Sequence, residues 1–239
     1  MDFKFDRLKP IKVLDEQDIK GLPICIQKYL KQTNVIGSPI VQTVRLKQKG
    51  LFNTNGKRWI NLKAKQYFNV EGFEFYWKAK GGIISVVDQF IGYKGELRVK
   101  FLGLITLALF KGEKLDRGEA LRFLSELIWF PTTFVHQDLK WEAIDEYGAK
   151  CTMSFKDISV SASFYFNEEG LMERFEAKRY REVKGDFELA KWEGYDFEYA
   201  EFNSIQIPYK ASVKWVTDDG DLPYYDMEIT EIEYNVSQL

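Results

Sequence analysis

His136 is the only histidine of the chain, so the search for catalytic chemistry starts there. Asp138, Glu142 and Glu126 are near it in the sequence, and Ser125 is a conceivable nucleophile. A zinc site or a Ser-His-carboxylate arrangement would have to be built around this one imidazole. However, Ser125 lies within a helical pattern, and no G-x-S-x-G turn presents it. A hydrolase that uses His136 with a nearby carboxylate stays open as an alternative to a plain capping or surface role for this residue.

Arg122 and Glu126 lie four residues apart in the most apolar helical segment of the chain. On a solvated helix, such a pair stabilises the helix by only ~0.3 kcal/mol. If the helix is instead buried against a sheet, the same pair would anchor a neighbouring strand or the polar head of a ligand. Both interpretations stay open.

Arg179 shares one face of a strand with Phe175 and Ala177, and this face is the apolar one. An inward arginine must be paired, because the burial of a bare charge is prohibitive. The following strand offers three candidate partners in a cross-strand network, namely Glu193, Asp196 and Glu198. The alternative is a guanidinium that binds the carboxylate or phosphate head of a ligand.

Other chemical motifs fail on spacing. The acidic turn at 218–221 lacks the alternating oxygen ligands and the terminal Glu of a calcium loop. The glycine pairs do not open a helix after a strand, so they form no phosphate cradle. Cys25 and Cys151 have no metal-finger spacing. The sequence therefore names no catalytic residue, no metal site and no cofactor.

The elements that must position these residues are mostly strands. In the segment 158–166, Ile158, Val160 and Ala162 point one way while serines point the other, which is typical of a sheet with one dry face. Similar segments, separated by Gly or Asx turns such as Asn55-Gly56, recur along the chain and indicate about twelve strands.

Two helices interrupt the strands, one near 22–33 and one near 116–129. Pro23 suits the first turn of the first helix. Asp116 and Glu119 have the spacing of a capping box that would begin the second helix, and Pro131 would end it. We expect one domain over residues 1–239, with the central helix on the concave side of the sheet.

The segment 101–110 (FLGLITLALF) is too apolar for a solvated loop and lacks clean alternation. It is interpreted as a buried segment. The alternative is an apolar flap at the mouth of the sheet, which would give the protein a peripheral membrane contact through 101–110.

Composition excludes several classes of protein. Among 239 residues, 34 basic and 36 acidic side chains give a net charge of −2 without long blocks of one sign, which argues against nucleic-acid binding. Aromatic residues reach 16%, enough for a wide apolar interior. No apolar run approaches the ~20 residues of a membrane-spanning helix. The opening residues 1–6 lack a signal-peptide pattern, so we expect a cytoplasmic location. The oligomeric state stays open.

Several short motifs, in this order, resemble those of a bacterial family of unknown function. The most specific is Trp-Phe-Pro-Thr at 129–132 after LRFLSE at 121–126, and Gly-Asp-Leu-Pro-Tyr occurs at 220–224. The chain departs from the family pattern at Cys25 and around 62–63. More loosely, the succession of antiparallel strands is similar to that of lipoprotein-carrier folds. This resemblance implies an incomplete barrel, with helices on its open side and a hydrophobic cavity for acyl chains.

We therefore expect a mainly β (α+β) protein: a single, strongly curved antiparallel sheet that forms an incomplete barrel with helices covering the concave side. We expect non-catalytic binding of a hydrophobic small molecule or lipid in the concave cavity. The predicted ligand-binding residues are Phe75, Trp77, Arg122, Glu126, Trp129, Trp141, Arg179 and Trp215.

Overall fold

A computed structural model describes residues 3–4, 8–53, 58–183 and 185–237. Within these ranges, the strands form one antiparallel sheet with the order β6-β5-β4-β3-β2-β1-β13-β12-β11-β10-β9-β8-β7. The expected single antiparallel sheet is confirmed, with thirteen described strands where about twelve were expected. The Asn55-Gly56 turn lies outside the described residues.

The bounds of the strands are β1 (Thr43–Asn53), β2 (Trp59–Asn69), β3 (Glu74–Gly81), β4 (Ile84–Ile91), β5 (Lys94–Phe101), β6 (Ile105–Phe110), β7 (Leu139–Ala143), β8 (Gly148–Phe155), β9 (Ile158–Phe166), β10 (Met172–Val183), β11 (Asp186–Phe202), β12 (Ile205–Thr217) and β13 (Gly220–Tyr234). The helices are α1 (Glu16–Ile19), α2 (Ile24–Gln32) and α3 (Glu113–Glu126), and two 3-10 turns follow α3, η1 (Leu127–Trp129) and η2 (Pro131–Val135).

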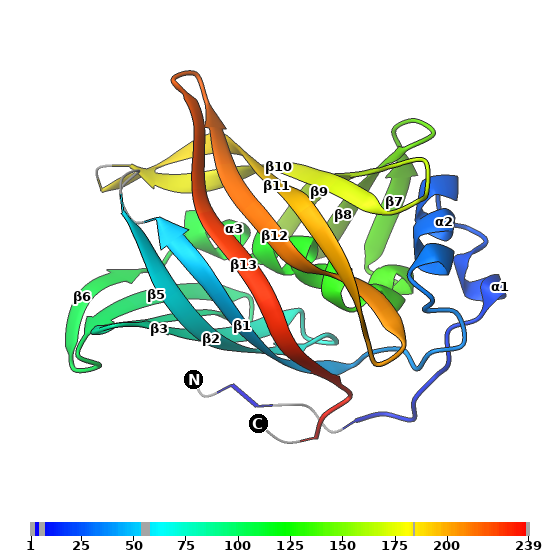
Figure 1. Cartoon of the computed structure of the whole chain (residues 1–239), viewed down its shortest axis with the longest axis horizontal. Helices are drawn as coiled ribbons and strands as arrows, with labels where there is room; N and C mark the ends of the chain where they lie inside the picture. The colour runs from blue at the N-terminus through cyan, green and yellow to red at the C-terminus, as the bar shows by residue number, and fades with distance from the viewer. Residues whose placement is uncertain (1–2, 5–7, 54–57, 184, 238–239) are drawn as a thin grey trace.

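The sheet joins two meanders, β1 to β6 and β7 to β13, through the pairing of β1 with β13. Its two edge strands are β6 and β7. Figure 1 shows the sheet curving around α3, which lies in the trough between the two meanders, while α1 and α2 lie at one end beside β7 and β8. The expected strong curvature is therefore confirmed.

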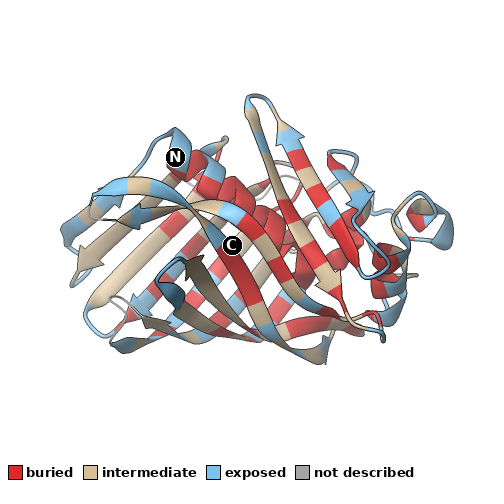
Figure 2. Cartoon of the chain, turned by 90° about the horizontal axis from the view of Figure 1, so that it is seen from above, coloured by how far each residue is buried: buried red, intermediate tan, exposed pale blue. Residues whose placement is uncertain are grey.

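Side chains alternate across the sheet as the sequence predicts. In β2, Leu62, Ala64 and Phe68 are buried on the concave face, while Lys63 and Lys65 are exposed on the convex face. Figure 2 shows the same banding of buried and exposed residues on strand after strand, with buried residues gathered around α3. The inner faces of both meanders and α3 share one hydrophobic core.

Helix α3 begins three residues earlier than expected. Its N-cap is Gly112, and Asp116 lies inside the helix, so the predicted capping box is wrong. The Asp116 carboxylate instead accepts hydrogen bonds from the Gly95 backbone N–H at 2.7 Å and from Lys94 at 2.8 Å, and these bonds fix the helix to β5. Gly95 permits this approach, because a Cβ there would lie 3.2 Å from the Leu115 backbone.

The segment 101–110 is not buried, so that interpretation is wrong. It forms a turn and the edge strand β6, and the Leu104 side chain is 82% exposed. High apolarity alone does not bury a strand when no further element lies beyond the edge of the sheet. In the described part of the chain, no helix is long and apolar enough to cross a membrane. The cytoplasmic location stays a prediction.

Candidate functional site

A cavity of about 330 Å³ lies in the trough. Strands β1 to β5 contribute one wall, β10 to β13 contribute the other, and α3 with η1 closes the inner side. Half-buried apolar side chains such as Phe52, Ile60 and Ile84 line it where the strands end. Buried residues, including Trp77 and Met227, line its deeper part. The cavity thus has an apolar mouth.

The deep part of the cavity is polar and centres on Arg122. The Arg122 guanidinium donates to Glu126 Oε1 at 2.9 Å and to Asp88 Oδ2 on β4 at 2.5 Å. It also lies over the rings of Phe75 and Trp77, at 4.8 and 5.1 Å from their centroids. All of these groups are largely withdrawn from water. The interpretation of Arg122 and Glu126 as a solvated pair is therefore wrong, because the trough encloses this face of α3.

Two glutamines extend this network into the sheet. Gln66 on β2 donates to Glu126 Oε2 at 2.6 Å and accepts from Gln48 of β1 at 3.0 Å. The indole N–H of Trp77 in turn donates to Gln48 Oε1 at 3.0 Å. A continuous chain of buried hydrogen bonds therefore links three strands to α3. Such a chain stabilises one arrangement of the groups, since each buried polar atom needs a partner.

Arg179 of β10 supplies the second buried guanidinium. It donates to the Gly118 carbonyl at 3.1 Å and to Glu119 Oε1 at 3.1 Å, and it lies 4.7 Å from the Trp192 ring centroid. The expectation that Arg179 must be paired holds, but the expected partners on β11 are wrong. The sheet curves so that β10 faces α3, and the helix rather than the next strand provides the carboxylate.

The Glu119 carboxyl is 2% exposed. Burial, followed by the nearby charge of Asp88, raises the pKa of Glu119 to about 8. Asp88 Oδ1 and Glu119 Oε2 receive no hydrogen bond from any described residue. The negative charge of Asp88 favours the neutral, protonated form of Glu119. With that proton in place, the cluster holds two guanidinium groups and two carboxylates, and its charges balance.

Trp129 also lines the cavity, and its indole Nε1 is buried without a hydrogen-bond partner in the described part of the chain. An unpaired buried N–H costs about 1–3 kcal/mol. The ring is fixed in place, since the Trp129 backbone carbonyl accepts a 2.6 Å hydrogen bond from Tyr234 and the ring packs against Phe68. The indole N–H is therefore a donor in a fixed position, and no described residue accepts from it.

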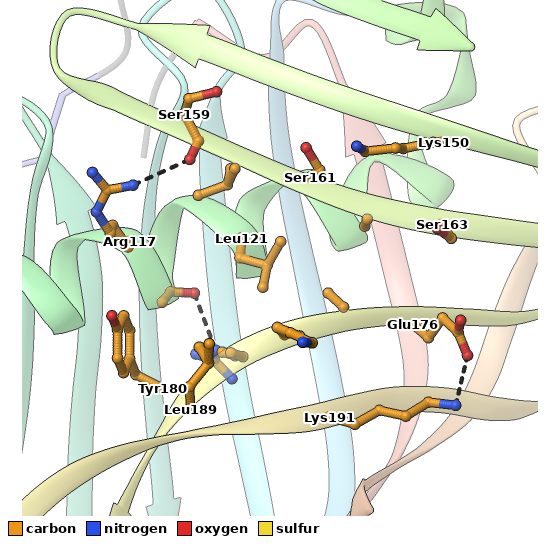
Figure 3. A pocket seen from close by; sticks show the side chains of 16 residues that line it. Arg117, Leu121, Lys150, Ser159, Ser161, Ser163, Glu176, Tyr180, Leu189 and Lys191 are labelled. Atoms are coloured by element: carbon orange, nitrogen blue, oxygen red, sulfur yellow. Dashed lines mark hydrogen bonds and ion pairs between the residues drawn. The ribbon is translucent and has the colours of Figure 1, made fainter.

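A second hollow, of about 620 Å³, lies between β9 and β10. The pairing of these strands ends at Ser163 and Glu176, and α3 forms the floor of the gap with Gly118 and Leu121. Figure 3 shows Leu121 between the separated strands.

The walls of this second hollow carry charged and hydroxyl groups, and several of them already have partners. Arg117 donates to the Ser159 carbonyl at 3.2 Å, and Lys191 lies 2.7 Å from Glu176 (Figure 3). Arg179 lines both hollows, and its bonds to α3 lie between them. The trough is therefore the better candidate for an apolar ligand.

Comparison with protein families decides the relationship of this chain. Residues 12–227 match the family described as "Family of unknown function (DUF6544)". The chain belongs to this family. The resemblance drawn from the sequence motifs is thus confirmed. The comparison with curated proteins gave no match.

Among solved structures, one of the similar proteins is a LolA superfamily protein from Nitrosomonas europaea. The identity is 10%, the TM-score is 0.47, and the match covers 88% of this chain and 94% of that chain. This likeness concerns the fold alone.

Five of the eight predicted ligand-binding residues line the trough, and these are Trp77, Arg122, Glu126, Trp129 and Arg179. Phe75 is fully buried beneath the Arg122 guanidinium. Trp141 lies outside the lining, where its indole N–H donates to the Phe134 carbonyl at 2.9 Å. Trp215 stacks on Tyr224 and also does not line the trough. The binding roles stay predictions.

The groups proposed for a hydrolase do not form a catalytic arrangement. The Ser125 hydroxyl donates to the Arg122 carbonyl within α3 at 2.8 Å. His136 does not line the trough, and its ring contacts Phe73 at 4.9 Å. Burial lowers the pKa of His136, and its nearest carboxylate oxygen, on Asp138, is 3.8 Å away. Nothing in this geometry favours the hydrolase alternative.

Sequence reasoning missed Asp88, Glu119, Gln48 and Gln66 as parts of the site. A signal for them existed. Asp88 interrupts the apolar run of β4, Gln48 occupies an inward position between Lys47 and Lys49, and Gln66 occupies one between Lys65 and Tyr67. Polar residues on the apolar face of a strand require buried partners, and such a position indicates a polar network.

Proposed function

We propose that this protein binds a hydrophobic, lipid-like ligand with an uncharged polar head in the trough beneath α3. The observation that supports this proposal best is the cavity itself, with its apolar mouth and its polar floor that retains unpaired atoms. Its volume of about 330 Å³ lies at the lower end of the range of small-molecule sites, about 300–1,000 Å³.

The polar floor favours a neutral head over an anionic one. Arg122 and Arg179 are the cations of the cavity lining, and both are already engaged by carboxylates. An added anion would have to be buried beside Asp88 and Glu126 without a free cation, which is costly. A hydroxyl or ester oxygen, in contrast, accepts from the Trp129 indole and introduces no charge. An adjacent hydroxyl could donate to Asp88 Oδ1.

The test compares monolaurin with laurate, because the two carry the same acyl chain but differ in the charge of the head. Binding of each is measured by isothermal titration below the concentration at which micelles form, and native mass spectrometry records the stoichiometry. We expect saturable one-to-one binding of monolaurin and at least tenfold weaker binding of laurate.

A matched pair of variants locates the site. Val86 lines the cavity, whereas Val87 lies on the opposite face of the same strand. Val86→Trp fills the cavity and should abolish binding of monolaurin, while Val87→Trp should leave it unchanged. Equal binding by both variants, or no binding by the wild type, would contradict the proposal.

A further inference from the structure

The convex face of β1 to β5 carries two rows of basic side chains, called here the lysine rows. The register of the sheet aligns lysines directly opposite one another on β1, β2 and β3, and the rows continue to β5 across Ser85 and Val87 of β4. One row contains Lys49, Lys63, Lys80 and Lys100, and the other contains Lys47, Lys65, Lys78 and Arg98.

Few acidic groups balance these rows. Lys47 pairs with Glu231, Lys49 with Glu228, and Arg98 with Glu96. The other five lysines make no ion pair with any described residue, and these are Lys63, Lys65, Lys78, Lys80 and Lys100. Like charges directly opposite on paired strands oppose folding. The whole chain has a net charge of −2, so this concentration of positive charge is local.

An exposed apolar surface adjoins the lysine rows. It consists of the β3–β4 turn and the β5–β6 hairpin and is called here the apolar tip: Ile83, Leu102, Leu104, Ile105 and Leu107, each 55–82% exposed. The two turns are held together, since the Leu102 N–H donates to the Ile83 carbonyl at 2.7 Å. These turns lie at the same end of the meander (Figure 1).

The two features form one surface. A hollow of about 820 Å³ on the convex face is lined by Lys78, Lys80 and Lys100 and, at its end, by Ile83 and Leu102. Long lysine side chains can therefore hold phosphate groups at the depth where the apolar tip enters an acyl layer, because lysine stems reach along apolar surface while the ammonium stays in the polar layer.

We propose that the lysine rows and the apolar tip together dock this protein on an anionic lipid bilayer. The apolar tip enters the interface, and the unpaired lysines bind lipid phosphates. A nucleic acid would satisfy the lysines but would leave the leucines of the tip exposed to water. The pairing of apolar and basic groups therefore favours a membrane.

Docking in this orientation brings the trough close to the membrane. Ile84 and Ile60 belong to the mouth of the trough, and Ile84 directly follows the tip residue Ile83. A ligand leaving the bilayer would then have a short path to the cavity. The docking itself does not depend on the cavity and is tested without ligand.

The test is flotation with phosphatidylcholine vesicles, with and without phosphatidylglycerol. We expect wild type to float only with the anionic vesicles. About 1 M salt shortens the screening length to about 3 Å and should release it. A lysine near an anionic surface contributes about fivefold to binding. Because the four factors multiply, a variant with Lys63, Lys65, Lys78 and Lys80 changed to Gln should bind roughly 600-fold more weakly than wild type.

The control changes four lysines outside the lysine rows to Gln, namely Lys140, Lys150, Lys156 and Lys178, and so removes the same number of positive charges. It should float like wild type. A Leu104→Asp, Leu107→Asp variant should bind at least roughly tenfold more weakly than wild type, because two leucines no longer enter the apolar layer. Circular dichroism and thermal unfolding verify that each variant folds.

Three outcomes would overturn the docking proposal. These are equal flotation of wild type with neutral and anionic vesicles, equal losses in the two lysine variants, and binding to duplex DNA that needs the lysine rows while flotation does not. Val86→Trp separates this proposal from the proposed function, because that variant should lose monolaurin but still float.

Discussion

Glu119→Gln tests the buried, protonated carboxyl at the floor of the trough. The pKa of Glu119 is raised from 4.5 to about 8, first by burial and then by Asp88. Folding therefore favours the protonated form. The stability that this proton contributes is fully present below pH 4.5 and is lost as the pH rises through about 8. At 1.36 kcal/mol for each unit, the loss over this window reaches about 4–5 kcal/mol.

Glutamine retains the shape of the protonated carboxyl and can donate to Asp88 Oδ1, but it does not titrate. At pH 5, wild type and Glu119→Gln should differ by no more than about 1 kcal/mol in unfolding free energy, the net value of one hydrogen bond. Above pH 8, the variant should be the more stable protein by several kcal/mol. The assay is urea unfolding followed by tryptophan fluorescence, at intervals between pH 5 and pH 9.

The difference between the two curves isolates Glu119, since all other groups titrate in both proteins. Glu173→Gln, at an exposed position of β10, is the matched control. Its unfolding free energy should vary with pH in the same way as that of wild type. If the unfolding free energy of Glu119→Gln also changed with pH as that of wild type does between pH 5 and pH 9, Glu119 would not hold a proton in the native protein. The charge balance drawn for the trough would then be wrong.

Two further substitutions examine the same floor. Arg122→Met leaves Asp88 and Glu126 buried without their shared cation, so it should lower the unfolding free energy by about 3–5 kcal/mol in urea denaturation. The exposed control Arg117→Met should lower it by less than about 1 kcal/mol. An equally small loss for Arg122→Met would show that the cluster is not desolvated. Trp129→Phe removes an indole N–H that has no partner among the described residues, so the unfolding free energy should change by less than about 1 kcal/mol. Monolaurin should bind several-fold more weakly to this variant in calorimetry. Unchanged affinity would exclude the indole as a donor to the ligand.

The strands and their inward faces were predictable because alternation is a local property. In β9, apolar and serine residues alternate, and both ends of the strand agree with the sequence prediction. The start of α3 was not predictable in this way. Asp116 has the spacing of a cap, but its carboxylate binds Gly95 of β5, a contact that depends on the tertiary packing of the helix.

The partners of the buried charges were equally beyond local reasoning. That Arg179 needs a partner follows from its position on an apolar face, but the choice of Glu119 depends on how far the sheet curves. In the segment 101–110, the sequence predicted burial where the structure has exposure. Its apolar residues resemble a core strand, yet whether an element covers them is decided by the order of strands in the sheet.

The guanidinium groups of Arg122 and Arg179 hold the walls of the trough at a defined distance from α3. Arg122 projects from α3 to Asp88 of β4, and Arg179 projects from β10 back to α3, so the opposite walls of the trough are tied through the helix. The width of the trough is therefore determined by the length of two ionic side chains as well as by its apolar walls. Exchanging either arginine for the shorter lysine should therefore change which ligands fit, while the apolar residues of the walls stay unchanged.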